Sequence, residues 1–118
     1  MLNTLIHYTQ LISYNFLYLK LGITQMSSTP RPHLEKIGRS IDQLKITLEV
    51  LSQLQGSIDR GAVHDIRNEL SLISSYAQLL NVKYAVELGS GATLYLKNIL
   101  TVCDLFIQEL KPEEHAQA

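Results

Sequence analysis

The stretch VHDIRNELSLISSYAQLL, residues 63–80, carries the clearest helical pattern of the chain. Apolar side chains recur there and just before it at steps of three and four residues, which is the spacing of one face of an α-helix. The members of this stripe are Ile58, Ala62, Ile66, Leu70, Ile73, Ala77 and Leu80. The stretch therefore predicts a helix with one buried face.

Two further segments repeat this pattern on either side. Residues 31–56 carry an apolar heptad seam, which predicts a helix that pairs with another helix. A third helix is expected to end at Pro112, because proline removes a backbone donor. The seam comprises Leu34, Ile37, Ile41, Leu44, Leu48 and Leu51, and the third stripe comprises Leu96, Ile99, Cys103, Phe106 and Leu110.

Glycines mark the expected breaks between these helices. Gly56 and Gly61 bracket a break or kink, with Ser57 or Asp59 as the cap of the next helix. Residues 81–90 are expected to turn the chain, with Gly89 and Gly91 supplying backbone freedom. The alternation of apolar residues over 82–88 is typical of a strand but is too short to carry a sheet alone.

The N-terminal residues 1–30 form an apolar segment followed by a proline-containing linker, SSTPRP. The apolar positions are spaced for an amphipathic helix, with one gap at Thr9, and predict docking on the rest of the protein or on a partner. Polar residues interrupt the segment, so membrane contact of residues 1–25 is the weaker alternative. Met26 is an alternative start of translation. The apolar positions are Leu2, Leu5, Ile12, Phe16, Leu19 and Ile23.

Length and composition narrow the class of protein. A chain of 118 residues is expected to form one domain, and its net charge of −1 argues against a nucleic-acid partner. The single cysteine, Cys103, lies in an apolar stripe and is expected to act as a small hydrophobic residue in a reducing, cytoplasmic setting. The remaining histidines show no spacing that suggests a metal site, and no cofactor is expected.

These patterns predict an all-α fold. Residues 31–56 form a lead-in helix, residues 57–112 an antiparallel helical hairpin, and residues 113–118 a polar tail. A hairpin leaves part of its apolar faces uncovered, so a homodimer that completes a four-helix bundle is expected.

A polar strip distinguishes the helix of residues 63–80. His64 points away from the apolar stripe, and Asn68, Ser71 and Ser75 follow it at steps of four, three and four on the same outward line. Asp65 and Arg67 stand at the two borders of this strip. The simplest interpretation of such a strip is a solvated surface, but the order of its residues is more specific.

The run from His64 to Ile73 resembles the phosphoacceptor H-box of two-component sensor histidine kinases. That motif has a histidine, an acid, an apolar residue, often arginine, and then threonine or asparagine, before a leucine and an isoleucine at the same offsets. The likeness is close over residues 58–80 and looser in the third helix, because the family's dimerisation and phosphotransfer domain is also a helical hairpin. It covers roughly half of the chain.

The resemblance implies roles for individual residues. It makes His64 the phosphoacceptor and Asp65 the group that orients the imidazole and accepts its proton. It makes Asn68 the group that can position a water molecule for dephosphorylating a partner receiver domain. An imidazole that is neutral at cellular pH has a free lone pair for attack on phosphorus, which agrees with this assignment. Arg67, Ser71 and Ser75 would then contact the partner, which is a response-regulator receiver domain or a histidine kinase.

Two departures from the family limit what the resemblance implies. Glu69 stands where many of these kinases have proline, so the kink that proline introduces is expected to be missing. The chain also lacks the family's nucleotide-binding motifs, so we expect no autonomous ATP-dependent kinase activity if it is complete.

Three functions therefore stay open at this stage. The leading one is a module that accepts a phosphoryl group on His64 and exchanges it with a receiver aspartate. The second is a decoy that binds a kinase or a response regulator and inhibits phosphotransfer. The third is a structural coiled-coil protein whose likeness to the H-box is coincidental.

Overall fold

The computed structural model of the protein describes residues 2–23, 31–54 and 59–117. These residues form three helical elements, which are α1 (Leu2–Ile23), α2 (Arg31–Leu54) and α3 (Arg60–Gln117). The described residues contain no strand, so the chain is all-α there, as expected. The expected break at Gly56 and the alternative cap Ser57 lie outside the described residues.

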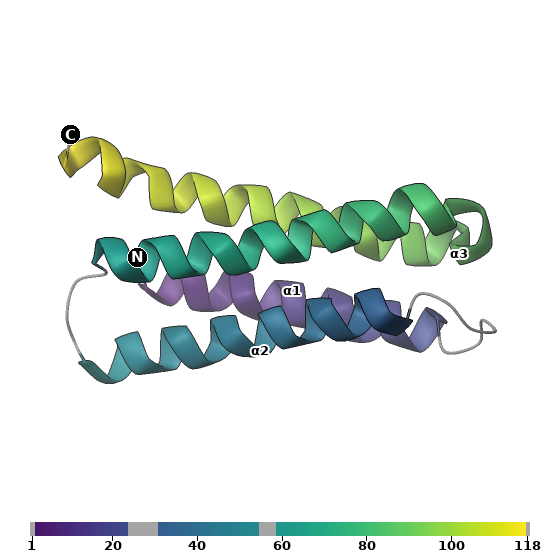
Figure 1. Ribbon diagram of the computed structural model, residues 1–118, viewed down its shortest axis with the longest axis horizontal. Coiled ribbons are helices and arrows are strands. Elements are labelled where there is room, and N and C mark those ends of the chain that lie inside the picture. The colour runs from purple at the N-terminus through teal and green to yellow at the C-terminus, as the bar shows by residue number, and fades with distance from the viewer. Residues whose placement is uncertain (1, 24–30, 55–58, 118) are drawn as a thin grey trace.

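The long element α3 consists of two helices joined by a sharp turn. Its 58 residues would span about 87 Å if straight, whereas the longest dimension of the molecule is 46 Å. The backbone leaves the helical region at Tyr84 (φ −123°, ψ 15°) and Gly89 (φ 75°, ψ 177°), and the chain turns back there (Figure 1). We call residues 60–83 the first arm and residues 90–117 the second arm. The turn falls within the expected range, at the expected glycine.

Four helical segments thus surround one apolar core. α1 contributes a continuous buried stripe that includes the gap residue Thr9, whose hydroxyl donates a hydrogen bond to the Leu5 carbonyl oxygen at 2.9 Å. The N-terminal segment therefore docks on its own chain. The other helices bury most of the expected faces. Leu34, Leu51 and Ala62 are half-buried, Val63 is buried beside Ala62, and the expected Ile58 lies outside the described residues. The core includes Ile37, Ile41, Leu44, Leu48, Ile66, Leu70, Ile73, Ala77, Leu80, Leu96, Ile99, Cys103, Phe106 and Leu110.

Ring contacts identify which helices are neighbours. α1 packs against the second arm, where the Tyr18 and Tyr95 rings stack with centroids 5.5 Å apart. α2 packs against the first arm, where the centroids of the His33 and Tyr76 rings lie 5.8 Å apart. Figure 1 shows α1 behind α2 and the first arm. Consecutive segments therefore follow one another around the bundle, and α1 and the first arm occupy opposite corners.

In this arrangement the chain itself covers the apolar faces that led us to expect a dimer. The apolar faces of the hairpin were expected to be covered by a second copy, yet α1 and α2 of the same chain share one core with both arms. A single chain thus supplies the four helices of a bundle.

Two further sequence expectations concern the ends of the chain. The second arm continues past Pro112 to Gln117, so the expected stop at Pro112 is wrong for the backbone. A proline within a helix removes one hydrogen bond and disfavours the helix without forbidding it.

In the part of the chain that the structure describes, no helix combines the length and apolarity needed to cross a membrane.

Candidate functional site

The first arm begins at a side-chain cap. The Asp59 carboxylate Oδ1 accepts a hydrogen bond from the Ala62 amide at 2.8 Å, and the Asp59 carbonyl oxygen accepts one from the Val63 amide at 3.0 Å. Asp59 itself is not helical. These contacts are those of a helix N-cap, as expected for Asp59. The cap fixes where the helix starts, and His64 follows slightly more than one turn later.

The predicted polar strip is on the surface of the bundle. His64, Asn68, Ser71 and Ser75 are all exposed, while Val63 and Ile66 on either side of the histidine are buried. The imidazole therefore points away from the core and is carried by a helix whose opposite face is fixed by packing. Such a group can reach a partner without any rearrangement of the bundle.

Two arginines border His64 on the same side of the helix. Arg67 follows it by three residues and is half-buried, whereas Arg60 precedes it by four residues and is exposed. Side chains at these offsets are neighbours on a helix surface, with Cβ atoms about 5–6 Å apart. Sequence reasoning identified Arg67 but missed Arg60, which the same spacing rule could have found.

Asp65 stands on the other border of the strip. It is exposed, and adjacent residues on a helix diverge by about 100°, so their side chains do not face each other directly. Among the described residues, neither the His64 nor the Asp65 side chain takes part in a hydrogen bond or an ion pair. The structure therefore brings His64, Asn68 and the two arginines to one surface, but it does not join Asp65 to the imidazole.

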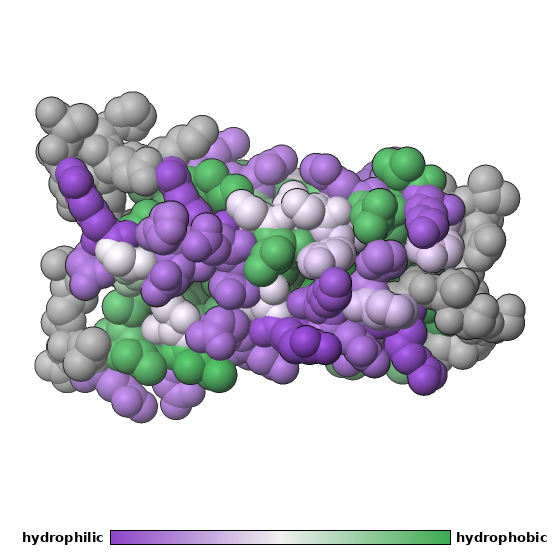
Figure 2. All heavy atoms as spheres, in the orientation of Figure 1, coloured by the Kyte–Doolittle hydropathy of each residue, from purple (hydrophilic) through white to green (hydrophobic). Residues whose placement is uncertain are grey.

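Apolar side chains continue the exposed face beyond the strip. Leu72, Leu79 and Val82 are 44%, 41% and 82% exposed. Their spacing of seven and three residues keeps them on the outward side of the first arm. Figure 2 shows that the face formed by α2 and the first arm is mainly hydrophilic, with apolar side chains in small separate groups. Sequence reasoning missed these residues because it followed only the polar members of the strip.

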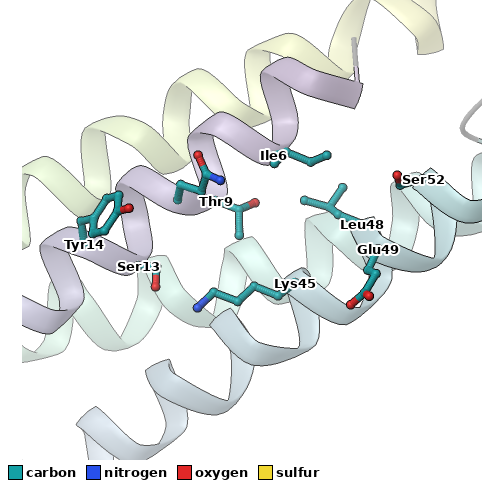
Figure 3. Close-up of a pocket in the computed structure, with 9 residues that line it drawn as sticks. Ile6, Thr9, Ser13, Tyr14, Lys45, Leu48, Glu49 and Ser52 are labelled. Carbon is teal, nitrogen blue, oxygen red and sulfur yellow. The ribbon is translucent and has the colours of Figure 1, made fainter.

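The structure also contains a groove that the sequence did not predict. It lies between α1 and α2, has a volume of about 490 Å³, and is open to solvent. Figure 3 shows Thr9 and Leu48 facing each other across it, with Lys45 and Glu49 along one wall. The described residues that line this groove include no histidine or cysteine. It offers an amphipathic surface but no nucleophile comparable with His64.

The cysteine thiol lies in the core, away from the polar strip. Cys103 is fully buried, and burial in the core raises the pKa of its thiol to about 12, with the nearby Asp104 carboxylate adding to the shift. Its predicted role as a small hydrophobic residue agrees with this position. The described residues contain no group of three or more histidine, cysteine or acidic side chains that could hold a metal ion.

Comparison with known proteins does not assign the chain to a family. No family model, no curated protein and no solved structure matches it.

Proposed function

We propose that the protein is a histidine phosphotransfer module in which His64 accepts a phosphoryl group and exchanges it with an aspartate of a receiver domain. The observation that carries the proposal is the exposed position of His64 on a helix whose other face is buried. The resemblance of residues 64–73 to an H-box supplies the identity of the chemistry. An outward imidazole on a packed helix is accessible to the phosphoryl group of a partner.

The proposed step transfers a phosphoryl group between two side chains. The unprotonated imidazole nitrogen of His64 attacks the phosphorus of an aspartyl phosphate, and the bond from phosphorus to the aspartate oxygen breaks. The electron pair of that bond leaves with the carboxylate, and the new bond joins nitrogen to phosphorus. The imidazole then carries a positive charge, which it loses by releasing the proton of its other nitrogen to Asp65 or to water.

The residues around His64 fit the charges of this step. Arg60 and Arg67, one turn before and after His64, can stabilise the negative charge on the transferring oxygens. Asn68, one turn after His64, is exposed and can position a water molecule or contact the partner. To accept the proton itself, Asp65 would have to rotate toward the imidazole, because no hydrogen bond joins the two side chains among the described residues.

Phosphoryl transfer from a labelled receiver tests the proposal directly. We expect a receiver domain that carries a radiolabelled aspartyl phosphate to transfer an acid-labile, base-stable label to the protein. His64→Ala should abolish the labelling, whereas His7→Ala should retain it, because His7 is an exposed histidine on α1. Labelling that survives in His64→Ala would contradict the proposal, as would the absence of labelling with every receiver of a representative panel.

The decoy function is the second candidate, and one observation favours it. The resemblance gives Asp65 the role of orienting the imidazole and accepting its proton, yet no hydrogen bond joins the two side chains in the described structure. A decoy would bind a receiver or a kinase with equal affinity in the wild type and in His64→Ala, and would inhibit phosphotransfer without becoming labelled. Binding measured alongside labelling therefore separates the two functions.

A further inference from the structure

α1 is apolar on two opposite faces. Its inner face packs into the core, and half of its outer face is apolar as well. Tyr14, Leu17, Tyr18 and Leu21 are 61%, 48%, 53% and 59% exposed. They follow one another at steps of three, one and three residues, which places them on one side of a helix. We call these four residues the α1 outer face. A second apolar face on a helix is a candidate for contact with another element or molecule.

We infer that the α1 outer face binds the same face of a second copy of the chain, with the two α1 helices antiparallel. The order of its residues favours this pairing. A two-fold axis between Leu17 and Tyr18 sets Tyr14 of one copy against Leu21 of the other, and Leu17 against Tyr18. Each tyrosine then meets a leucine, so the surface is complementary to itself, as a two-fold symmetric interface requires.

The area of this surface allows a dimer that also buries a polar rim around it. At about 200 Å² for a whole side chain of this size, the four exposed fractions leave roughly 450 Å² of mainly apolar surface per copy. Two copies would cover about 900 Å², and because interfaces are only about 60% apolar, the total with a polar rim approaches 1,500 Å². Stable and specific interfaces bury about 1,200–2,000 Å².

Charge also favours a second copy over a lipid surface. Lys20 is the only lysine, arginine, aspartate or glutamate of α1, and its ammonium group lies 5.0 Å from the centroid of the Phe16 ring of the same helix. The helix therefore offers neither the basic border that binds anionic lipid nor like charges that would repel a copy of itself. Stacking of Tyr18 on Tyr95 holds one of the four side chains in place before binding, which lowers the entropy lost on association.

The position of the interface keeps His64 accessible. α1 and the first arm occupy opposite corners of the bundle, so the two strips would point away from each other in the dimer. The interface thus differs from the one expected for the hairpin, and it does not depend on the proposed phosphotransfer.

Sedimentation of the full chain tests the inference. We expect a dimer between about 1 µM and 1 mM, the range that covers weak and moderate affinities. Leu17→Glu should weaken association at least about tenfold, because it places a charge at the centre of the interface. Leu72→Glu is the matched control, since Leu72 has a similar exposure on the opposite corner, and it should leave the dimer intact. A monomeric wild type, or a dimer broken by Leu72→Glu and not by Leu17→Glu, would overturn the inference.

Disulfide trapping provides a second measurement that does not depend on a charged variant. A mixture of Tyr14→Cys and Leu21→Cys chains should form mixed disulfides faster than either variant crosslinks with itself. The native Cys103 is buried and should not compete. Faster self-crosslinking of Tyr14→Cys would contradict the antiparallel arrangement. Flotation of the wild type with vesicles that contain phosphatidylserine, without self-association in solution, would assign the surface to lipid and reject the dimer.

Discussion

Replacing Leu70 with alanine tests the face assignment on which the position of His64 depends. Leu70 lies on the first arm and is fully buried. Its truncation removes apolar side-chain atoms from the core and leaves a cavity, which costs about 3 kcal/mol or more at fully buried leucines. Leu70→Ala should therefore lower the free energy of unfolding by about 3 kcal/mol, a large part of the 5–15 kcal/mol that is typical of whole domains.

Leu72 provides the comparison within the same helix. It is the same residue type two positions later, and it is 44% exposed. The lost transfer free energy is about half of that for a buried leucine, no closed cavity forms, and alanine favours a helix slightly more than leucine does. We expect Leu72→Ala to cost at most about 1 kcal/mol.

Urea unfolding followed by circular dichroism at one protein concentration measures both variants. The difference of about 2 kcal/mol between them should appear as a shift in the urea midpoint at unchanged slope. In thermal unfolding it should appear as a difference of roughly 8–10 °C in Tm for a chain of this length. Equal effects of the two substitutions, or a larger effect of Leu72→Ala, would mean that the first arm is rotated about its axis. His64 would then not point to solvent, and the proposed phosphoacceptor role would lose its basis.

Four other substitutions test local features. Asp59→Ala should lower the free energy of unfolding by about 1 kcal/mol by removing the cap of the first arm, as measured by urea unfolding. Gly89→Ala should cost about 1–3 kcal/mol, because an added Cβ meets no atom but the positive φ is unfavourable, whereas Gly91→Ala, also in open space at an ordinary φ, should stabilise the helix by up to about 1 kcal/mol. The raised pKa of Cys103 means that the native state keeps the thiol proton between pH 9 and 12 while the unfolded state loses it. Stability should therefore fall with rising pH in that window, and the fall should be smaller in Cys103→Ala when urea midpoints are compared.

The buried faces of the helices could be predicted from the sequence because side-chain spacing alone determines which residues share a face. This holds for α1, where the gap at Thr9 proved to be a buried residue whose hydroxyl bonds to its own helix. It also holds for the exposure of His64, since a residue two positions from the buried Ile66 must point outward. These conclusions need no knowledge of how the helices are connected in space.

Features that depend on packing between helices could not be predicted in this way. The sequence pattern does not reveal that α1 and α2 cover the hairpin, because periodicity shows that a face is buried but not what buries it. The groove between α1 and α2 is of the same kind. The relation of Asp65 to His64 also depends on side-chain rotamers, which a motif does not specify.

The two unusual surfaces of the bundle are arranged so that one can be covered while the other stays free. A phosphoacceptor must remain open to a partner, and an apolar patch of about 450 Å², the size of the largest patch on a typical monomer, is often a site of interaction. If both lay on the first arm, self-association through the apolar face would block His64. Their placement on opposite corners removes this conflict, because a dimer through α1 presents two outward imidazoles. We therefore expect Leu17→Glu to leave the rate of labelling of His64 unchanged per chain, even though it separates the two copies.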